Sequence, residues 1–551
     1  MIAEERDVRL EYNTVVFVSF ENQFAPAGGL AAVMKMLPPA VSKYRKTILI
    51  TPLFQNIEKT RNALDCGQIA STGLKAKVLY RGTYHPIEVF EAKLSRDENR
   101  YSILLVKANS FFLAGENPYI DTWRENALFN DAYFLCKSVP VVLELVKSTF
   151  PPPYVVHLQD WETALTVETM HYSLPNKCVL TLHNSYDYRL LNDPENRTVL
   201  QHTIPNMQGI STVSDQFSQE LTSDVLQTDI FAPMLQDQLN LMHPVGINNG
   251  NFVELAFPAD LTSTNEILSV KRRSREAFNE TLQSRGDLAP LWGNKLNLLD
   301  GGDVPIFLLF GRDDPKQKGF DVAAASIYKL FKRKGTSVGY FIFAPIPGVN
   351  GLDGLAYLGD LCKEFGNNIM VFPFRLSAGY LELQRASSYV IMPSYYEPFG
   401  AANEGYANGV PVIARATGGL LQQVRPVNIG DLPEKTSSLV KKYHQGNLDR
   451  PTGFLYREHP NTETASNWEH LFGTDFKARR TIQEPVDRMN PVFWSMVVQL
   501  EAVLEKAVAY YKDDKDGYCR MIVNGIDLFK DFSWDKAARK YFDLLYKLPI
   551  S

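Results

Sequence analysis

Short apolar runs alternate with longer amphipathic segments along most of the chain. The runs are rich in Val, Ile, Leu and Phe, and their apolar residues are consecutive instead of alternating with polar ones. Six runs lie in the first half, at residues 15–20, 47–52, 102–108, 154–159, 178–184 and 209–214, and five follow at residues 305–312, 338–345, 368–374, 389–394 and 410–416. Strands of this kind are buried on both faces, so the pattern predicts two parallel sheets covered by helices.

This pattern predicts an α/β protein with two doubly wound domains. We expect a first domain at residues 1–260 and a second at residues 303–524, joined by a polar connecting region at residues 261–302. The final stretch, residues 525–551, places large apolar residues at helical spacing among charged ones, and so predicts an amphipathic terminal helix with a face to bury.

Composition narrows the class of protein. The chain has 551 residues, of which 45% are hydrophobic and 22% charged, and a formal net charge of −5. This charge gives no reason to expect nucleic acid or an anionic membrane as a partner. No apolar run is long enough to span a bilayer, and the N-terminus is charged and unlike a signal peptide, so we expect a cytoplasmic protein.

Cysteine and acidic patterns give no sign of a metal site. The five cysteines form no C-x-x-C pair and suit reduced, buried thiols. Asp514 and Asp516 have a D-x-D spacing, but no apolar strand precedes them, and we interpret them as part of a solvated loop. We therefore expect no metal and no cofactor.

Polar residues follow the predicted strands. They are Glu21, Asp160, His183, Ser214, Arg312, Glu397 and the pair Gly418–Gly419. Each could merely cap the next helix. Ligands in open parallel sheets bind outside the carboxyl ends of the strands, however, and the shared placement of these residues predicts a substrate cleft between two facing sheets.

The strand ends of the second domain suit a nucleotide diphosphate. Arg312 and Lys318 supply two cations, and glycines 418 and 419 open a helix where a phosphate could approach the backbone closely. Glu397 is either an acid at the start of a helix or a catalytic carboxylate. No G-x-x-x-x-G-K-[ST] loop occurs, and no G-x-G-x-x-G follows the first strand, which argues against a kinase and a dinucleotide oxidoreductase.

Several of these segments resemble motifs of the glycogen and starch synthases, which are retaining glycosyltransferases of the GT-B fold. The matching segments are FAPAGGLAAVMKMLPPAV, VVHLQDWETAL, LTLHNSYDYR, STVSDQFSQEL, GINNGNF, FGRDDPKQKGFD, PSYYEPFG, ATGG and DFSWDKAARKYFDLLY. They occur in the family's order and cover most of the chain, with weaker stretches at residues 53–101 and 426–491. The resemblance implies two facing Rossmann-like domains, with a C-terminal helix that crosses back to the first.

The resemblance also implies roles for individual residues. Arg312 and Lys318 would hold the diphosphate of a nucleotide sugar, and Glu397 would face the transferred sugar. His183 and Asp160 would bind the sugar hydroxyls. Further substrate contacts are expected from Gly28, Gly29, Asn249, Gly400, Glu404, Thr417, Gly418 and Gly419.

Departures from the family pattern bear on the substrate. Pro26 and Ala32 stand where bacterial glycogen synthases have Lys and Asp, and Gln159 replaces a His. Glu404 follows Glu397 by seven residues, whereas related enzymes place their ribose-binding acid after eight. Glu404 therefore either reaches the ribose through a shortened loop or serves only as a helix-start acid.

The sequence thus predicts a retaining glucosyltransferase that moves glucose from ADP-glucose or UDP-glucose to the non-reducing end of an α-1,4-glucan. One alternative is a hexosyltransferase acting on a small sugar or sugar phosphate. Another is an inactive relative that only binds a nucleotide sugar or a glucan. The retention of Arg312, Lys318 and Glu397 argues against the inactive protein. The base of the donor and the oligomeric state stay open.

Overall fold

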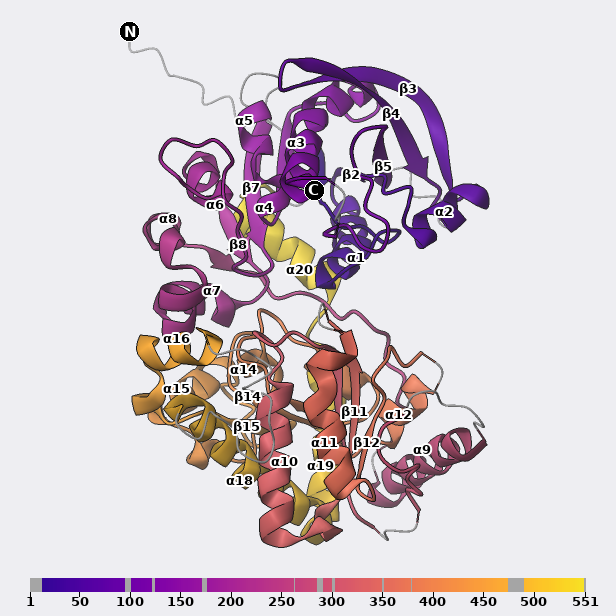
Figure 1. The fold of residues 1–551 in the computed structure, drawn as a ribbon, viewed down its shortest axis with the longest axis vertical. Coiled ribbons are helices and arrows are strands. Elements are labelled where there is room, and N and C mark those ends of the chain that lie inside the picture. The colour runs from indigo at the N-terminus through magenta and orange to yellow at the C-terminus, as the bar shows by residue number, and fades with distance from the viewer. Residues whose placement is uncertain are drawn as a thin grey trace. The chain divides into compact units, whose positions relative to one another are not determined.

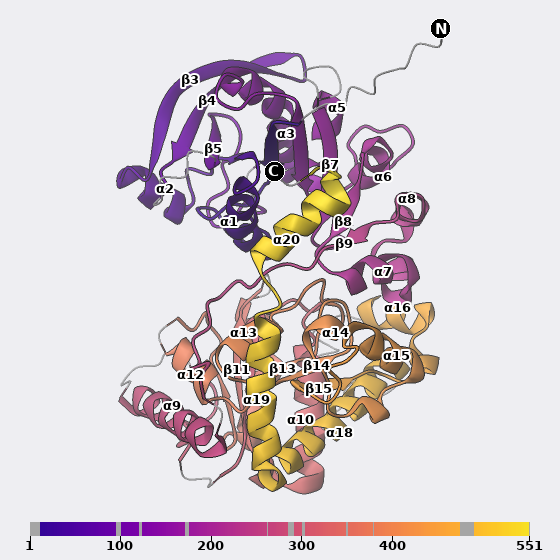
Figure 2. The same ribbon diagram turned by 180° about the vertical axis from the view of Figure 1, so that it is seen from behind.

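The computed structural model describes residues 12–94, 101–120, 124–170, 176–261, 263–284, 291–299, 303–348, 351–377, 379–473 and 490–549. The chain divides into two compact units (Figures 1 and 2). The first comprises Met1–Thr222, Phe231–Phe252 and Ser533–Ser551. The second comprises Ser223–Ile230 and Val253–Phe532.

The described residues of the first unit form a nine-stranded sheet in the order β3-β4-β5-β2-β1-β6-β7-β8-β9. The strands are β1 (Thr14–Val18), β2 (Lys46–Pro52), β3 (Ile69–Tyr80), β4 (Thr83–Ala92), β5 (Tyr101–Ala108), β6 (Tyr154–Gln159), β7 (Asn176–Leu182), β8 (Ile210–Thr212) and β9 (Val245–Gly246). Strand β4 runs antiparallel to both β3 and β5, and the other neighbours are parallel.

Helices of the same unit accompany this sheet, all but the last of them from the same part of the chain. They are α1 (Gly29–Ser42), α2 (Glu58–Asp65), α3 (Ala127–Val146), α4 (Trp161–Ala164), α5 (Thr166–Met170), α6 (Val199–Thr203), α7 (Asp215–Ser223), α8 (Gln236–Met242) and α20 (Trp534–Lys540). The central strands β1, β2 and β6 are almost wholly buried. This burial explains why their sequences are continuous apolar runs.

The second unit has a six-stranded, fully parallel sheet among its described residues, in the order β12-β11-β10-β13-β14-β15. The strands are β10 (Ile306–Arg312), β11 (Tyr340–Ile346), β12 (Ile369–Val371), β13 (Tyr389–Met392), β14 (Val412–Arg415) and β15 (Gly453–Tyr456). The helices are α9 (Thr264–Ser284), α10 (Phe320–Lys334), α11 (Ala356–Phe365), α12 (Tyr380–Ala386), α13 (Ala402–Ala407), α14 (Leu420–Gln423), α15 (Glu434–Tyr443), α16 (Ala465–Gly473), α18 (Pro491–Asp513) and α19 (Lys515–Phe529).

Every apolar run predicted as a strand forms one, and the structure confirms the α/β class. The second sheet is parallel as predicted, whereas the first is mixed because β4 runs antiparallel to its neighbours. The long antiparallel hairpin of β3 and β4 was not predicted. Most of its residues are exposed or only partly buried, so the hairpin lacks the continuous apolar run that marks the other strands.

The region at residues 261–302, expected as a connection, belongs to the second unit. Phe278 and Leu282 of α9 are buried in a core cluster with Leu308 of β10 and Ile342 of β11. Lys271 fixes the same helix, since its Nζ donates to the carbonyl oxygens of Arg385, at 2.7 Å, and Ser387, at 2.5 Å. Most residues of α9 are polar, so the sequence analysis missed the apolar face by which the helix joins this core.

The C-terminal stretch divides between the units at residue 533, eight residues later than the boundary expected from the sequence. Helix α19 ends at Phe529 within the second unit, and α20 begins at Trp534 in the first. Figure 2 shows α20, in yellow, beside α1. Asp514 starts α19 by accepting a hydrogen bond from the Gly517 amide at 2.7 Å, so it caps a helix instead of lying in a solvated loop. Of the stretch 426–491, residues 474–489 lie outside the described part.

Candidate functional site

In the first unit, a buried carboxylate holds the glycine loop between β1 and α1. Glu21 Oε2 accepts hydrogen bonds from the amides of Ala27, at 2.8 Å, and Gly28, at 2.7 Å. Its other oxygen accepts the Tyr119 hydroxyl at 2.8 Å. A Cβ at Gly29 would meet no described atom within 4 Å, so the first residue of α1 is open. Gly28 and Gly29 therefore form an ordered loop whose outer side is accessible.

Asp160 and His183 lie together at the ends of the neighbouring strands β6 and β7. Asp160 Oδ1 accepts the His183 amide at 2.7 Å, and His183 Nε2 lies 2.8 Å from Gln159 Oε1. Because that amide oxygen can only accept, Nε2 carries the proton, and burial lowers the pKa of His183 to about 3. The ring is thus neutral, with Nδ1 as an acceptor. Gln159, which departs from the family pattern, sets this tautomer.

Burial raises the pKa of Asp160 to about 7, and the charge of Glu21 adds to the effect, while the His183 amide opposes it. Because the pKa of Asp160 is raised, the folded protein binds this proton more tightly than the unfolded chain does. The contribution of Asp160 to the free energy of unfolding therefore falls as the pH rises from about 4 to about 7. The carboxylate form is tolerated at a cost, as is common where a side chain is kept for a ligand.

We predict that Asp160→Asn stabilises the protein while it impairs transfer. The asparagine keeps an oxygen for the His183 amide and removes the buried charge. Its gain in melting temperature should be larger at pH 8 than at pH 5, because the wild-type folded protein loses its proton between these values. Thermal unfolding at both pH values measures this, and an equal or greater gain at pH 5 would contradict the assignment.

Glu162, which the sequence analysis did not single out, belongs to the same acidic cluster. It lies in the first turn of α4, is 6% exposed, and its Oε2 has no hydrogen-bond partner among the described residues. Burial, followed by the charge of Asp160, raises its pKa well above the usual range. The sequence could have pointed to Glu162 through the segment QDWE, in which two acids are separated by a single residue.

Asn249 is placed by a glycine turn. A Cβ at Gly246 would lie 2.2 Å from the Cα of Asp215, and one at Gly250 would lie 2.4 Å from the Trp534 amide nitrogen, so both positions require glycine. Asn249 is 4% exposed, and its Oδ1 has no partner among the described residues. This orphaned acceptor is suited to a ligand hydroxyl.

In the second unit, Lys318 and Glu397 form an ion pair, with Lys318 Nζ 2.6 Å from Glu397 Oε2. Ser394 donates to the same oxygen at 3.0 Å. The pairing depends on a close backbone approach, because Gly319 adopts a φ of +60° and a Cβ there would lie 2.1 Å from the Pro393 carbonyl oxygen. The Glu397 side chain is 10% exposed, so the lysine compensates a largely buried carboxylate.

Arg312 stands at the end of β10, next to β13 in the sheet, and is exposed. Within the described residues its guanidinium has no hydrogen-bond or ion-pair partner. Within the described part of the chain, the structure therefore pairs Lys318 with Glu397 but gives the Arg312 guanidinium no such partner.

Glu404 lies in the first turn of α13. Burial raises its pKa to about 7, while the positive charge of Lys318 and a hydrogen bond from Gln384 lower it. It is thus within electrostatic reach of Lys318 despite its shortened spacing from Glu397.

Gly418 and Gly419 are required by their close approach to the backbone of Glu397, a packing role that the sequence did not predict. Gly418 has a φ of +47°, and a Cβ there would lie 1.9 Å from the Glu397 carbonyl oxygen. The Gly419 amide donates to that same oxygen at 3.0 Å. This amide is therefore occupied by the Glu397 loop. Gly400, with a φ of +83°, completes the packing against Gln423, and Thr417 is buried beside the pair.

We predict that Gly418→Ala displaces the Glu397 loop and lowers transfer at least tenfold. The alanine is strained by its positive φ, at about 1–3 kcal/mol, and it also collides with the Glu397 carbonyl. Gly446→Ala is the matched control, since Gly446 has a φ of +79° but no atom within 4 Å of its Cβ position. Melting temperature and turnover are compared. Equal effects of the two substitutions would contradict the packing role.

A buried ionic network that sequence reasoning missed supports both loops. Glu458 accepts Arg415 Nε at 2.8 Å, and Arg415 also donates to the Tyr395 carbonyl oxygen just before Glu397. Arg457 donates to the Ala416 carbonyl oxygen at 2.8 Å, just before Thr417. Although burial alone would raise it, the two arginines bring the pKa of Glu458 down to about 2. The network thus fixes the two backbone turns against each other.

The described residues contain no group of three or more His, Cys, Asp or Glu side chains placed to hold a metal ion. None of their helices is long and apolar enough to cross a lipid bilayer.

Comparisons with known proteins bear on the fold and on the class of enzyme. Residues 14–236 match the starch synthase catalytic domain, and residues 288–450 match a family 4 glycosyltransferase of conflict systems. Glycogen synthase of Thermotoga petrophila is 24% identical over 97% of this chain and 98% of its own length. Glycogen synthase of Geotalea uraniireducens is 23% identical over 98% of this chain and 99% of its own length.

Among solved structures, the catalytic domain of starch synthase IV from Arabidopsis thaliana, determined with ADP and acarbose, superposes with a TM-score of 0.65 at 17% identity. It covers 97% of this chain and 99% of its own. Sucrose-phosphate synthase from Thermosynechococcus elongatus has a TM-score of 0.50 at 14% identity and covers 97% and 98%. The chain therefore has the fold of the GT-B glycosyltransferases. Among proteins of this fold, the chain is similar to glycogen synthases over almost its whole length and to the starch synthase catalytic domain over residues 14–236.

Proposed function

We propose that this enzyme is a retaining glucosyltransferase that moves glucose from ADP-glucose or UDP-glucose to the non-reducing end of an α-1,4-glucan. The observation that carries the proposal is the Lys318–Glu397 ion pair at the end of β13, with the exposed Arg312 at the end of the adjacent strand. Full-length similarity to glycogen synthases supports the choice of reaction.

The two cations are assigned to the leaving diphosphate. A glycosyl donor breaks into a sugar with cationic character and a nucleotide diphosphate, so catalysis requires that the new phosphate charge be neutralised. Lys318 is held in place by Glu397 before any donor binds. The guanidinium of Arg312 has no partner among the described residues, and its planar fork suits two phosphate oxygens. The starch synthase IV structure was determined with ADP, which supports a diphosphate ligand for this fold.

Glu397 is assigned to the sugar. Its Oε2 is used by Lys318 and Ser394, so the carboxylate is fixed in orientation before the reaction. A fixed negative charge near the anomeric carbon stabilises the positive charge that develops there. Glu404, within reach of Lys318, is assigned to the ribose of the donor.

Residues of the first unit are assigned to the hydroxyl groups of the hexose. Neutral His183 offers its Nδ1 as an acceptor, and Asp160 and Asn249 add further oxygen acceptors. Gly28 and Gly29 supply an open loop held by Glu21. Such a set recognises neutral hydroxyls and needs no metal or cofactor. The five free cysteines suit the cytoplasm, which we propose as its compartment.

The acceptor is tested with a matrix of substrates. ADP-glucose and UDP-glucose are each offered with maltooligosaccharides, glucose, fructose 6-phosphate or glucose 6-phosphate, and products are resolved by chain length. We expect the oligosaccharides to grow by single hexoses. Transfer confined to a monosaccharide would overturn the glucan assignment and establish a small-acceptor hexosyltransferase. This alternative is included because the uncharged Pro26 and Ala32 stand where bacterial glycogen synthases have Lys and Asp.

A further inference from the structure

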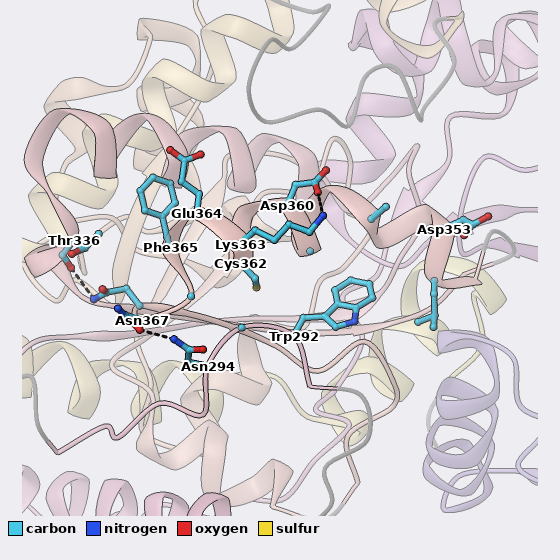
Figure 3. A pocket seen from close by; sticks show the side chains of 16 residues that line it. Trp292, Asn294, Thr336, Asp353, Asp360, Cys362, Lys363, Glu364, Phe365 and Asn367 are labelled. Carbon is cyan, nitrogen blue, oxygen red and sulfur yellow. Dashed lines mark hydrogen bonds and ion pairs between the residues drawn. The ribbon is translucent and has the colours of Figure 1, made fainter.

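Two surface features lie outside the candidate site. One is a groove of about 840 Å³ along α11 in the second unit (Figure 3). Its lining includes Asp360 and Lys363, which pair with each other at 2.7 Å, so these charges are compensated within the chain. The other is the outer edge of the first unit's sheet, where the charged side chains of β3 have no such partners within the described residues. This edge therefore calls for a partner more strongly than the groove does.

Strand β3 forms the outer edge of that sheet. Figures 1 and 2 show it as the outermost strand, and among the described residues it pairs with β4 alone. It has 12 residues, whereas most strands have about five or six. Its side away from β4 presents a row of backbone N–H and C=O groups, to which a further strand can bond. An edge strand of this length is a template for strand addition.

The turn of the hairpin shows which residues of β3 direct their backbone groups outwards. A two-residue turn, Arg81–Gly82, with φ of +47° and +80°, joins the paired residues Tyr80 and Thr83. In such a hairpin the two residues next to the turn bond to each other, and the direction of the backbone groups alternates along each strand. The residues of β3 that direct their N–H and C=O groups away from β4 are therefore Lys75, Lys77 and Leu79.

Aromatic packing holds this end of the hairpin rigidly. The Tyr80 hydroxyl donates to Asn130 Oδ1 of α3 at 2.9 Å. The centroid of the Tyr80 ring lies 5.2 Å from that of Phe111 and 5.8 Å from that of Phe134. Phe111 and Phe134 stack on each other with their centroids 3.8 Å apart. The edge is thus ordered before any partner binds, which lowers the entropic cost of binding.

The exposed face of the edge is basic. Lys75 and Lys77 are exposed on the same face of β3, and Arg81 follows in the turn. None of the three forms an ion pair within the described part of the chain. Lys77 lies opposite Pro86 of β4, so no acid of the hairpin stands directly across from it. Because the whole chain has a net charge of −5, this positive edge is a local feature.

These charges discriminate between possible occupants of the edge. Pairing of β3 with the same strand of a second copy would bring the lysines of the two chains together, which is unfavourable across strands. An acidic strand instead places carboxylates opposite Lys75 and Lys77. Leu79 and Tyr84, which face each other across the hairpin and are 50% and 65% exposed, offer an apolar contact beside them. Charge complementarity therefore favours an acidic partner.

We propose that the edge of β3 is a docking site for an extended acidic segment of a partner protein, which adds to the sheet as an antiparallel strand. Its backbone pairs with Lys75, Lys77 and Leu79, and its carboxylates lie beside the two lysines. Antiparallel pairing continues the arrangement of β3, β4 and β5. In this mode of recognition the main chain supplies affinity and the side chains supply specificity. The interaction is independent of the transfer reaction.

A short fluorescein-labelled peptide that alternates Glu and Val is the probe, and fluorescence anisotropy measures its binding to the full-length protein. Lys77→Glu replaces an attraction by a repulsion across the strands and should weaken binding about tenfold. Lys93→Glu is the matched control, because Lys93 is exposed at the other end of the hairpin and undergoes the same change of charge. It should bind the peptide like the wild type. Melting temperatures show whether both variants are folded.

N-methylated peptides test the strand pairing without any change to the protein. Residues opposite each other in an antiparallel pair share a face, and the outward residues of β3 exchange both bonds with those opposite them. The glutamates that face the lysines are therefore the residues that donate to β3. N-methyl groups on the glutamates should abolish binding, whereas the same number on the valines should leave it largely unchanged.

Three results would overturn the proposal. The first is absence of binding by the unmethylated peptide. The second is an equal effect of the two methylation patterns, or equal binding by Lys77→Glu and Lys93→Glu, since either would show attraction by charge without strand addition. The third is a dimer of the full-length protein that Leu79→Pro abolishes, because proline removes an outward N–H and the edge would then be occupied by a second copy.

Discussion

Replacing Lys318 with alanine is expected to lower turnover at least a hundredfold while the protein stays folded. The substitution leaves Glu397, whose side chain is 10% exposed, without its cation and removes one of the two cations that we assign to the leaving diphosphate. Truncating one member of a buried charge pair costs about 2–5 kcal/mol. Arg312→Ala should give a loss of the same order because Arg312 is the second cation assigned to the diphosphate.

Lys316→Ala is the matched control for both substitutions. Lys316 is exposed in the same turn, and its backbone amide bond to Asp314 survives the substitution. Steady-state rates of nucleotide release are compared at saturating acceptor, with melting temperatures recorded in parallel. Near-normal turnover in Lys318→Ala and Arg312→Ala would show that the loop containing these two residues has no role in catalysis.

Ending the chain after Phe532 is expected to leave no soluble protein. The removed residues include Tyr541, Phe542 and Tyr546, all 0% exposed in the core cluster of the first unit. Each fully buried large apolar side chain contributes about 1.5–3 kcal/mol, and a domain is stable by only about 5–15 kcal/mol. The loss also strands the buried His157, whose Nδ1 lies 2.8 Å from the Tyr546 hydroxyl.

A chain that ends after Pro549 is the control, since it keeps all of these residues and the carbonyl that Arg45 binds. It should be soluble and melt like the full-length protein. Both chains are compared by expression in the soluble fraction and by thermal unfolding. A soluble, active protein ending at Phe532 would show that the first unit does not need the returning segment.

Strand prediction succeeded where burial on both faces leaves a continuous apolar sequence. Strand β3 was missed because most of its residues are exposed or only partly buried. Helix α9 was assigned to a connection because most of its residues are polar, although Phe278 and Leu282 are buried in the core. In both elements most residues are polar or exposed to solvent, so the local sequence does not show which of them are buried. Only the tertiary packing shows this.

The sequence indicated candidate site residues one by one but did not indicate their contacts with each other. Lys318 and Glu397 were each identified at a strand end, but their pairing depends on the close approach of Gly319 to the Pro393 carbonyl. The same holds for Gly418, which accommodates the Glu397 backbone. Contacts of this kind join segments that are about 75 and 20 residues apart in sequence, and periodicity carries no information on them.

The central claim is that glucosyl transfer to a glucan consumes the nucleotide sugar. The most direct measurement is the release of free nucleotide from ADP-glucose or UDP-glucose by the full-length enzyme, with and without glycogen. We predict release that depends on glycogen, with one glucose incorporated per nucleotide and almost none released in its absence. Release at the same rate without any acceptor, or none with either donor in the presence of glycogen, would contradict the account.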